Sequence, residues 1–335
     1  MTKRSIGLAC IGTGYICEIH ARSAAAVEGV CLKAVWSRSQ DSGKRFSERH
    51  RISRVFTDHR QLLNDPEVDA VIIGLPTPLH HKTVLEASEA GKHILCEKPI
   101  AASVKEGEEM IRSAAAAGVL LMVGHVLRFW PEYMAAKQLA DGGSLGRIVS
   151  LSACRLSSVP RWSAGSWLLD PGQSGGVPVD LQIHDIDFIR WLLGEPLDVA
   201  AKGTKNPKGL VSDVVSLFQF QGALASAHAS WALPEGEKFK TGFELIGDGG
   251  VLRYDNLSKP TLSLSQNGKA QPPPALRSID PYVAQLEYFV ECVRTSRSPL
   301  RCPPEDSLAA LALSLRVKSL VDSCSTTGQV RGSLS

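Results

Sequence analysis

Short apolar runs alternate with longer segments of helical character along the first 125 residues. The run Ala70–Leu75 is almost entirely apolar, as expected of a parallel strand that is covered on both faces. Strands separated by helices imply right-handed βαβ crossovers, so this part predicts a doubly wound parallel sheet of the Rossmann type. The predicted strands are Ser5–Ile11, Cys31–Trp36, Arg54–Phe56, Ala70–Leu75, His93–Cys96 and Val119–Val123, and the predicted helices are Ile16–Val27, 39–50, Lys82–Glu89 and Ser103–Ala117.

The pattern changes after Val126, where strand-like segments follow one another before two C-terminal helices. Runs of strands followed by helices indicate an α+β domain on a mostly antiparallel sheet. We therefore predict two domains, 1–125 and 126–335. Strands are predicted at 147–157, 213–220, 223–232, 240–247 and 250–254, helices at 131–140, 178–193, 280–295 and 304–324, and loops or a meander at 158–178 and 256–278.

The composition of the chain mainly excludes classes of partner and site. A formal net charge of +3 is too small a bias to indicate nucleic acid or a membrane surface as a partner. The eight cysteines include no C-x-x-C pair, so we expect neither a zinc site nor a dithiol redox motif. The apolar stretch Ile6–Ile11 is too short for a signal peptide and Val119–Val123 too short for a bilayer span, so we expect a cytoplasmic protein.

Gly12-Thr13-Gly14 follows a predicted strand and opens a predicted helix. Gly12 permits a tight turn, Gly14 lets the backbone approach a pyrophosphate, and the helix N-terminus supplies N–H groups. The third small residue of the dinucleotide fingerprint is Cys17 here, so the fingerprint is incomplete and a simple βα turn is the alternative.

Cofactor preference is set where the second strand ends, because an acid there binds the ribose 2′-hydroxyl of NAD. This chain has Ser37 and Arg38 at that point and no acid until Asp41. Serine and arginine suit a 2′-phosphate, which favours NADP over NAD, although a solvated loop arginine is the ordinary alternative.

Two further groups carry polar chemistry. Lys98, within Glu97-Lys98-Pro99, directly follows a predicted parallel strand, where ligands bind in such sheets, although a surface Lys–Glu pair is the simpler interpretation. Asp180, His184 and Asp187 have i, i+4, i+7 spacing, which places them on one face of a helix. Asp180 could orient His184 as a general base, or His184 could be a core histidine whose hydrogen bond Asp180 satisfies. A metal site is not indicated, because no third ligand is evident in the sequence.

The order of these motifs resembles one family. The Gly12–Gly14 turn is followed by Leu-Pro-Thr-Pro-Leu-His at 75–80, Glu-Ala-Gly-Lys-His-Ile-Leu-Cys-Glu-Lys-Pro at 89–99, and Gly-Gly-x3-Asp-x3-His-x2-Asp at 175–187. This arrangement is similar to that of the glucose–fructose oxidoreductase, inositol dehydrogenase and rhizopine catabolism (Gfo/Idh/MocA) family. The resemblance implies a Rossmann domain, a C-terminal α+β domain with a large open sheet, and hydride transfer between NAD(P) and a sugar-like carbinol.

The resemblance also implies residue roles. His184 would take the proton of the reacting hydroxyl, Asp180 and Lys98 would support that transfer, and the Lys98–Pro99 bond would be cis. Thr77 and His80 would lie beside the nicotinamide ribose. We predict cofactor contacts from Gly12, Gly14, Tyr15, Ile16, Ser37, Arg38, Pro76, Thr77, His80, Glu97 and Lys98, and substrate contacts from Lys98, Arg128, Trp162, Trp167, Asp180 and His184, with Arg161 beside the two tryptophans.

These inferences predict an NAD(P)-dependent oxidoreductase that acts on a sugar, cyclitol or related polyol and needs no metal. One alternative is a glycosidase that uses tightly held NAD in a redox cycle; another is a non-catalytic dinucleotide sensor, against which the joint presence of Lys98, Asp180 and His184 argues. An open sheet leaves a large apolar surface, so we expect a homodimer or homotetramer formed through the C-terminal sheet.

Overall fold

A computed structural model describes residues 5–160 and 164–324. The chain forms two compact units. Unit 1 comprises the described residues within Met1–Ala135, Arg161–Trp167 and Ala275–Leu311; unit 2 comprises those within Ala136–Pro160, Leu168–Pro274 and Ala312–Ser335. The segment 275–311, which the sequence places in the second domain, thus belongs to the unit of the first.

Unit 1 is built on a six-stranded parallel sheet with the order β3-β2-β1-β4-β5-β6. The predicted doubly wound fold is confirmed, because the strand order reverses direction between β1 and β4. The strands are β1 (Ile6–Ile11), β2 (Val30–Trp36), β3 (Arg54–Phe56), β4 (Ala70–Ile73), β5 (His93–Cys96) and β6 (Leu121–Val123).

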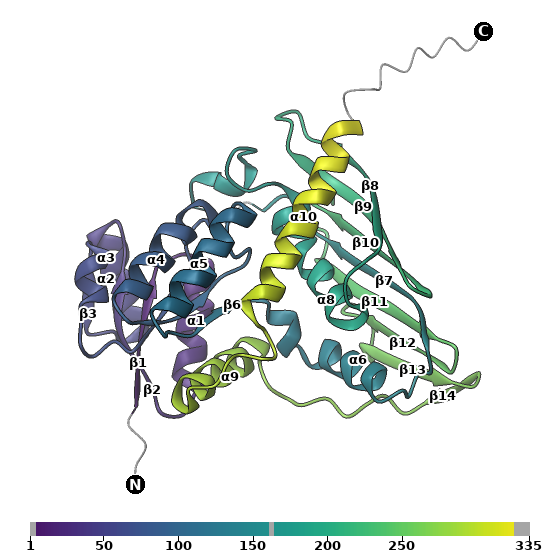
Figure 1. The fold of residues 1–335 in the computed structure, drawn as a ribbon, viewed down its shortest axis with the longest axis horizontal. Coiled ribbons are helices and arrows are strands. Elements are labelled where there is room, and N and C mark those ends of the chain that lie inside the picture. The colour runs from purple at the N-terminus through teal and green to yellow at the C-terminus, as the bar shows by residue number, and fades with distance from the viewer. Residues whose placement is uncertain (1–4, 161–163, 325–335) are drawn as a thin grey trace. The chain divides into compact units, whose positions relative to one another are not determined.

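The helices of unit 1 follow the predicted pattern, except for one helix that was not predicted and one that was predicted in the second domain. The structure adds α3 (His59–Leu63), and it places the C-terminal helix α9 (Pro281–Thr295) against α1 (Tyr15–Ala26). Leu286, Phe289 and Val290 of α9 are buried with Leu8 and Ile72 of the sheet, which is why this distant segment belongs to unit 1 (Figure 1). The remaining helices are α2 (Gln40–His50), α4 (His80–Glu89) and α5 (Val104–Ala116), with 3-10 turns η1 (Thr77–Leu79) and η2 (Val126–Phe129).

Unit 2 is built on an eight-stranded sheet with the order β14-β13-β12-β11-β7-β10-β9-β8. All neighbouring strands are antiparallel except β7 and β10, which confirms the mostly antiparallel sheet. The strands are β7 (Ile148–Leu156), β8 (Asp198–Lys205), β9 (Val211–Phe220), β10 (Ala223–Ser230), β11 (Lys240–Gly247), β12 (Gly250–Asp255), β13 (Leu262–Gln266) and β14 (Lys269–Gln271). The alternating burial of β9 shows that one face of the sheet is covered and the other is open.

The covered face packs against α7 (Val177–Asp180) and α8 (Ile183–Leu193), and Figure 1 shows α8 lying along this face. The sequence predicts a single helix over 178–193. The structure divides it at Leu181-Gln182, because the Gln182 N–H donates to the carbonyl of Val177, five residues back. Helices α6 (Pro131–Asp141) and α10 (Pro304–Cys324) begin in unit 1 and end in unit 2, and so does the 3-10 helix η3 (Ala164–Leu169).

Within residues 5–160 and 164–324, none of the helices combines the length and the hydropathy that a bilayer span requires.

Candidate functional site

The loops that follow the central strands of unit 1 are joined at one edge of the sheet. Gly12 donates its N–H to the carbonyl of Trp36, Gly74 to that of Ile11, and Glu97 to that of Ile73, at 3.0, 3.1 and 3.0 Å. These bonds hold the ends of β1, β2, β4 and β5 together at the edge where ligands bind in doubly wound sheets.

The turn after β1 fits a dinucleotide phosphate. Gly12 has φ +119°, and a Cβ there would lie 2.8 Å from the Gly74 carbonyl oxygen, so a side chain is excluded on both counts. Gly14 is the N-cap of α1 without a side-chain cap, and its Cβ direction is open, with no described heavy atom within 4 Å. The N-terminal N–H groups of α1 therefore have an unobstructed approach, which suits an anionic group. Tyr15 is 57% exposed beside this turn and Ile16 is half-buried.

The end of β2 presents Ser37 and Arg38 next to the same turn. Ser37 is buried, and its Oγ lies 3.5 Å from Thr13 Oγ1 and accepts from the Ser39 N–H. Arg38 is exposed, and among the described residues its guanidinium has no hydrogen-bond or ion-pair partner. Ser37 thus shapes the loop, while Arg38 offers a charge to a ligand.

The loop after β4 and the start of α4 carry three predicted cofactor residues, which differ in burial and in hydrogen-bond partners. Pro76 is half-buried and Thr77 is buried. His80 is also buried, and its Nδ1 and Nε2 lie 3.0 Å and 2.9 Å from the carbonyl oxygens of Pro99 and Leu75. Both ring nitrogens are therefore occupied by the protein backbone, so we do not retain His80 as a direct cofactor ligand.

Lys98 is half-buried directly after β5, and its peptide bond to Pro99 is cis, as the resemblance implies. The preceding Glu97 is buried, and its Oε1 lies 2.6 Å from Nε2 of the buried His20 of α1. Burial raises the pKa of Glu97, but hydrogen bonds from His20 and from the Lys98 N–H, together with the charges of His20 and Lys98, outweigh it, so the pKa lies below its ordinary value. Glu97 is therefore an ionised carboxylate that is paired with His20 inside unit 1.

His20 was not predicted as a site residue from the sequence. Cys17, Ala21 and Ala24 are buried on the same helix, so His20 belongs to its apolar stripe. A histidine within an apolar stripe requires a polar partner, which was the available signal, but nothing in the spacing pointed to Glu97, 77 residues away.

In unit 2, Asp180 ends α7 and His184 lies in the first turn of α8. Both are half-buried, whereas Ile183, Asp185 and Ile186 beside His184 are buried. Gln182 between them is fully buried, with its Nε2 donating to the Ala227 carbonyl at 2.9 Å and its Oε1 accepting from Ser216 at 3.0 Å. Gln182, which was not predicted from the sequence, fixes the α7–α8 junction to the sheet, with the half-buried Asp180 and His184 two residues to either side of it.

Asp185 and Asp187 have structural surroundings. Asp185 is fully buried, and both its oxygens accept from Arg155 of β7, at 2.9 and 3.1 Å. Burial raises the pKa of Asp185 above its ordinary value, and the guanidinium of Arg155 lowers it only in part. Asp187 is also fully buried, unlike the half-buried Asp180 and His184.

The predicted substrate residues outside these helices differ in burial and in their contacts. Arg128 is 1% exposed, and its Nη1 donates to Asp306 and to the Arg301 carbonyl, at 2.7 and 2.9 Å. This arginine is occupied within unit 1, so we do not retain it as a substrate ligand. Trp167 is half-buried in η3. Trp162 and Arg161 lie outside the described residues.

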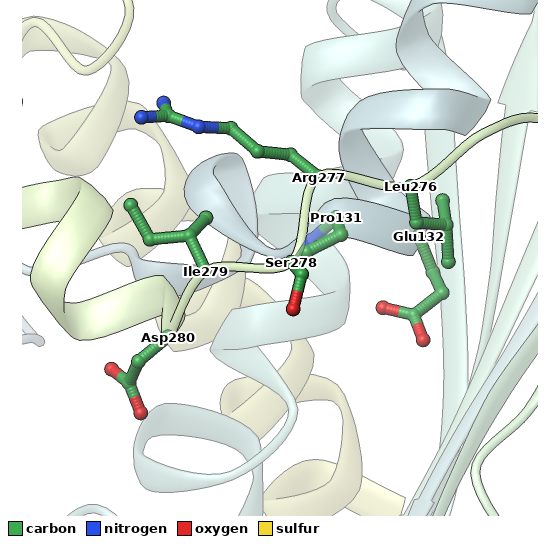
Figure 2. A pocket seen from close by; sticks show the side chains of 7 residues that line it. All are labelled: Pro131, Glu132, Leu276, Arg277, Ser278, Ile279 and Asp280. Carbon is green, nitrogen blue, oxygen red and sulfur yellow. The ribbon is translucent and has the colours of Figure 1, made fainter.

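Two pockets of unit 1 lie away from the predicted residues. A pocket of about 430 Å³ lies at the start of α6, and Figure 2 shows the carboxylates of Glu132 and Asp280 on opposite sides of Ser278. Asp280 caps α9 by accepting from the N–H groups of Tyr282 and Val283, so its carboxylate is already used. The second pocket, of about 620 Å³, is lined by residues at the starts of β1, β4 and β5, the edge opposite Gly12 and Lys98.

Comparison with known proteins decides the family. Residues 6–125 match the oxidoreductase family with an NAD-binding Rossmann fold, and residues 133–253 match the GFO/IDH/MocA C-terminal domain. The chain belongs to the Gfo/Idh/MocA family. The resemblance drawn from the motifs is therefore confirmed, and the chain is an NAD(P)-dependent oxidoreductase.

Two relatives from Bacillus subtilis (strain 168) differ in cofactor. The chain is 31% identical to scyllo-inositol 2-dehydrogenase (NADP(+)) IolU over 261 residues, 76% of this chain and 77% of that one. It is 29% identical to scyllo-inositol 2-dehydrogenase (NAD(+)) over 316 residues, 89% of each chain. Among solved structures, UDP-N-acetylglucosamine 3-dehydrogenase GnnA from Acidithiobacillus ferrooxidans is 26% identical with a TM-score of 0.83, covering 95% of this chain and 98% of that one.

Proposed function

We propose that this member of the Gfo/Idh/MocA family oxidises or reduces a carbinol carbon of a sugar or cyclitol, with Lys98, Asp180 and His184 as its proton-transfer set. The observation that carries the proposal is that Lys98 lies at the same edge of one sheet as the glycine turn that suits a dinucleotide. The sugar and inositol dehydrogenases among its relatives support the substrate class.

Gly12, Gly14 and the first turn of α1 would hold the pyrophosphate of NAD(P), and Thr77 and Lys98 would lie toward its nicotinamide ribose. When bound, the nicotinamide supplies the redox chemistry by exchanging a hydride with the carbinol carbon. His184 takes the hydroxyl proton in the oxidative direction, and Asp180 orients the imidazole and stabilises its charged form. Lys98 donates a hydrogen bond to the same oxygen, on which negative charge develops.

The proposal is tested by incubating the enzyme with inositols, aldoses and anhydro sugars and following reduced cofactor by absorbance. We expect turnover with at least one polyol, with NAD⁺ or NADP⁺. Cleavage of a glycosidic bond without net cofactor reduction would support the redox-cycling glycosidase instead. Tight dinucleotide binding without any turnover would support the sensor.

We further propose that Arg38 favours NADP over NAD. A 2′-phosphate adds close to two negative charges, and a charge-assisted hydrogen bond contributes about 1.5–3 kcal/mol, or roughly ten- to a hundredfold in affinity. Replacing Arg38 with Ala should therefore weaken NADP⁺ binding by about that factor and leave NAD⁺ binding nearly unchanged, as measured by titration of each cofactor.

The matched control is Arg45→Ala, because Arg45 is an exposed arginine of the neighbouring helix α2 whose Nη2 donates to Ser42. It should leave both affinities unchanged. If the wild type binds NAD⁺ more tightly than NADP⁺, or if Arg38→Ala keeps its NADP⁺ affinity, Arg38 is not a phosphate ligand and Asp41 becomes the candidate for a ribose contact.

We also propose that the open face of the unit 2 sheet forms a dimer or tetramer interface. Val215 and Leu217 of β9 and Leu224 of β10 are 43, 57 and 55% exposed on this face. Leu217 is flanked across the strands by the small residues Ala200 and Ser226, which leave its side chain protruding from this face. A second copy of the chain would cover such a patch.

Sedimentation velocity should give the mass of two or four chains for the wild type, and the mass of one chain for the double variant Leu217→Asp/Leu224→Asp. The control is Leu300→Asp, since Leu300 is an 82% exposed leucine of unit 1. A wild type that sediments as a single chain at micromolar concentration would refute the interface.

A further inference from the structure

The segment Glu97-Lys98-Pro99 is held on its N-terminal side by a buried carboxylate–imidazole pair. His20 is fully buried, and its Nε2 lies 2.6 Å from Glu97 Oε1. The other oxygen of Glu97 accepts from the backbone N–H of Lys98 at 3.2 Å. Since the carboxylate is an acceptor, the imidazole donates through Nε2, and the contact fixes Glu97 relative to α1.

Gly124 provides the space that this pair needs. A Cβ at Gly124 would lie 2.8 Å from Glu97 Oε1 and 3.0 Å from Oε2. Gly124 itself donates its N–H to the carbonyl of Cys96, the residue before Glu97. Any side chain at this position would therefore displace the carboxylate from His20.

The same segment is held on its C-terminal side by a second buried histidine. His80 Nδ1 lies 3.0 Å from the Pro99 carbonyl oxygen, and its Nε2 lies 2.9 Å from that of Leu75. Both partners are acceptors, so a neutral imidazole satisfies one of them and an imidazolium satisfies both. In either state the ring links the loop after β5 to the loop after β4.

We infer that His20 and His80 are positioning residues that fix the backbone on both sides of Lys98, and thereby aim its side chain at the reacting oxygen. The backbone sets where the lysine stem begins and which way it leaves the chain, so contacts that hold the backbone on both sides limit the region that the amine can reach. His20 lies on the helix that opens at the glycine turn, and His80 directly follows η1. The inference rests on the proposed function for the role of Lys98.

Paired amide variants test the two contacts separately. The amide nitrogen of a glutamine reaches the position of Nε2, and that of an asparagine reaches the position of Nδ1. His20→Gln therefore keeps the donor to Glu97 and His20→Asn removes it, whereas His80→Asn places a donor at the Pro99 carbonyl and His80→Gln leaves that carbonyl without one.

We expect kcat to fall about ten- to a hundredfold in His20→Asn and His80→Gln, because a catalytic group displaced by about 1 Å loses activity on this scale. His20→Gln and His80→Asn should restore kcat to within about threefold of the wild type, with dinucleotide Kd changed by less than about threefold in all four variants. A merely structural role would not reproduce this opposite preference for Asn and Gln at the two sites.

Hydrogen–deuterium exchange gives a readout that needs no substrate. Peptides covering 96–101 should exchange faster in His20→Asn and His80→Gln than in their partner variants. Gly124→Ala should have the same effect by displacing Glu97, and it serves if His20→Asn does not fold. The control is His81→Gln, since His81 is the next residue of α4 and pairs with Glu109 at 2.8 Å, away from this segment.

Equal kcat for the Asn and Gln variants at each site, or unchanged exchange over 96–101, would overturn the inference. Faster exchange without any loss of kcat would also overturn it, because Lys98 would then not depend on these contacts. If the wild type turns over no sugar or cyclitol, the proposed function fails, while the exchange comparison still decides whether the two histidines hold this segment.

Discussion

Replacing His184 or Lys98 with Ala is expected to lower kcat by about 10²–10⁴-fold, the usual cost of losing a positioned proton-transfer group. The dinucleotide Kd should stay within about threefold of the wild type, because an interaction used in the transition state contributes to kcat rather than to binding. Stopped-flow single turnovers and cofactor titrations measure the two quantities separately. Asp180→Asn should give a smaller loss, since it keeps a hydrogen-bonding side chain but removes the charge that stabilises the imidazolium.

The controls remove the same kinds of side chain elsewhere. Lys105 is an exposed lysine seven positions beyond Lys98, and His81 is a partly exposed histidine of α4, so Lys105→Ala and His81→Ala should retain activity. If Lys98→Ala or His184→Ala keeps more than about half of the wild-type turnover, the catalytic assignment is wrong, because a positioned proton-transfer group typically contributes about 10²–10⁴-fold.

The sequence predicts unit 1 well because its signals are local. Near-continuous apolar strands such as Ala70–Ile73 alternate with capped helices, and the order of elements then fixes the sheet through the handedness of the crossovers. The glycine turn is equally local, since strand, glycines and helix follow one another within a few residues. Lys98 follows from the same rule, because the end of a parallel strand is a ligand edge.

The parts that sequence reasoning missed depend on contacts between distant segments. The packing of α9 onto α1 joins residues more than 250 positions apart, and no periodicity in either helix specifies its partner. The His20–Glu97 pair and the role of Gln182 are of the same kind. The break between α7 and α8 was missed for another reason: Leu181 and Gln182 keep helical backbone angles, so the hydrogen-bond slip leaves no trace in the side-chain pattern.

Two predicted site residues have polar atoms that already contact other parts of the protein. Arg128 follows the last strand of the Rossmann sheet, where a substrate contact is reasonable, yet its guanidinium is buried against Asp306. His80 likewise lies in the expected loop, but both of its ring nitrogens contact backbone carbonyl oxygens. Whether a polar side chain faces a ligand or its own protein is decided by burial, which a single sequence specifies only coarsely.

The largest effect on stability is expected at the Arg155–Asp185 pair. Both side chains are buried, at 7 and 0% exposed, and two hydrogen bonds join them. Arg155→Met would leave the Asp185 carboxylate buried without its cation, and breaking a buried pair in this way costs about 3–5 kcal/mol. Urea denaturation at pH 7 and fixed protein concentration measures the change in the free energy of unfolding.

The double variant Arg155→Met/Asp185→Leu should recover most of that loss, because replacing a whole buried pair with apolar side chains is often neutral. The control is Arg253→Met, since Arg253 pairs with Glu244 on the open face of the same sheet with both side chains substantially exposed. Exposed pairs of this kind contribute about 0.2–1 kcal/mol. Equal losses in Arg155→Met and Arg253→Met would contradict the assignment of a buried, mutually dependent pair.

The pH dependence of the Arg155→Met variant separates an unpaired charge from a packing defect. Burial already holds the pKa of Asp185 above its ordinary value of 3.8, and removing the guanidinium, which lowers it, should raise it further. The folded protein then binds the proton more tightly than the unfolded chain, so its stability falls as the pH rises from about 3.8 through the folded-state pKa. The deficit of Arg155→Met relative to the wild type should therefore shrink as the pH is lowered, whereas a deficit that is the same at pH 5 and pH 7 would indicate lost packing instead.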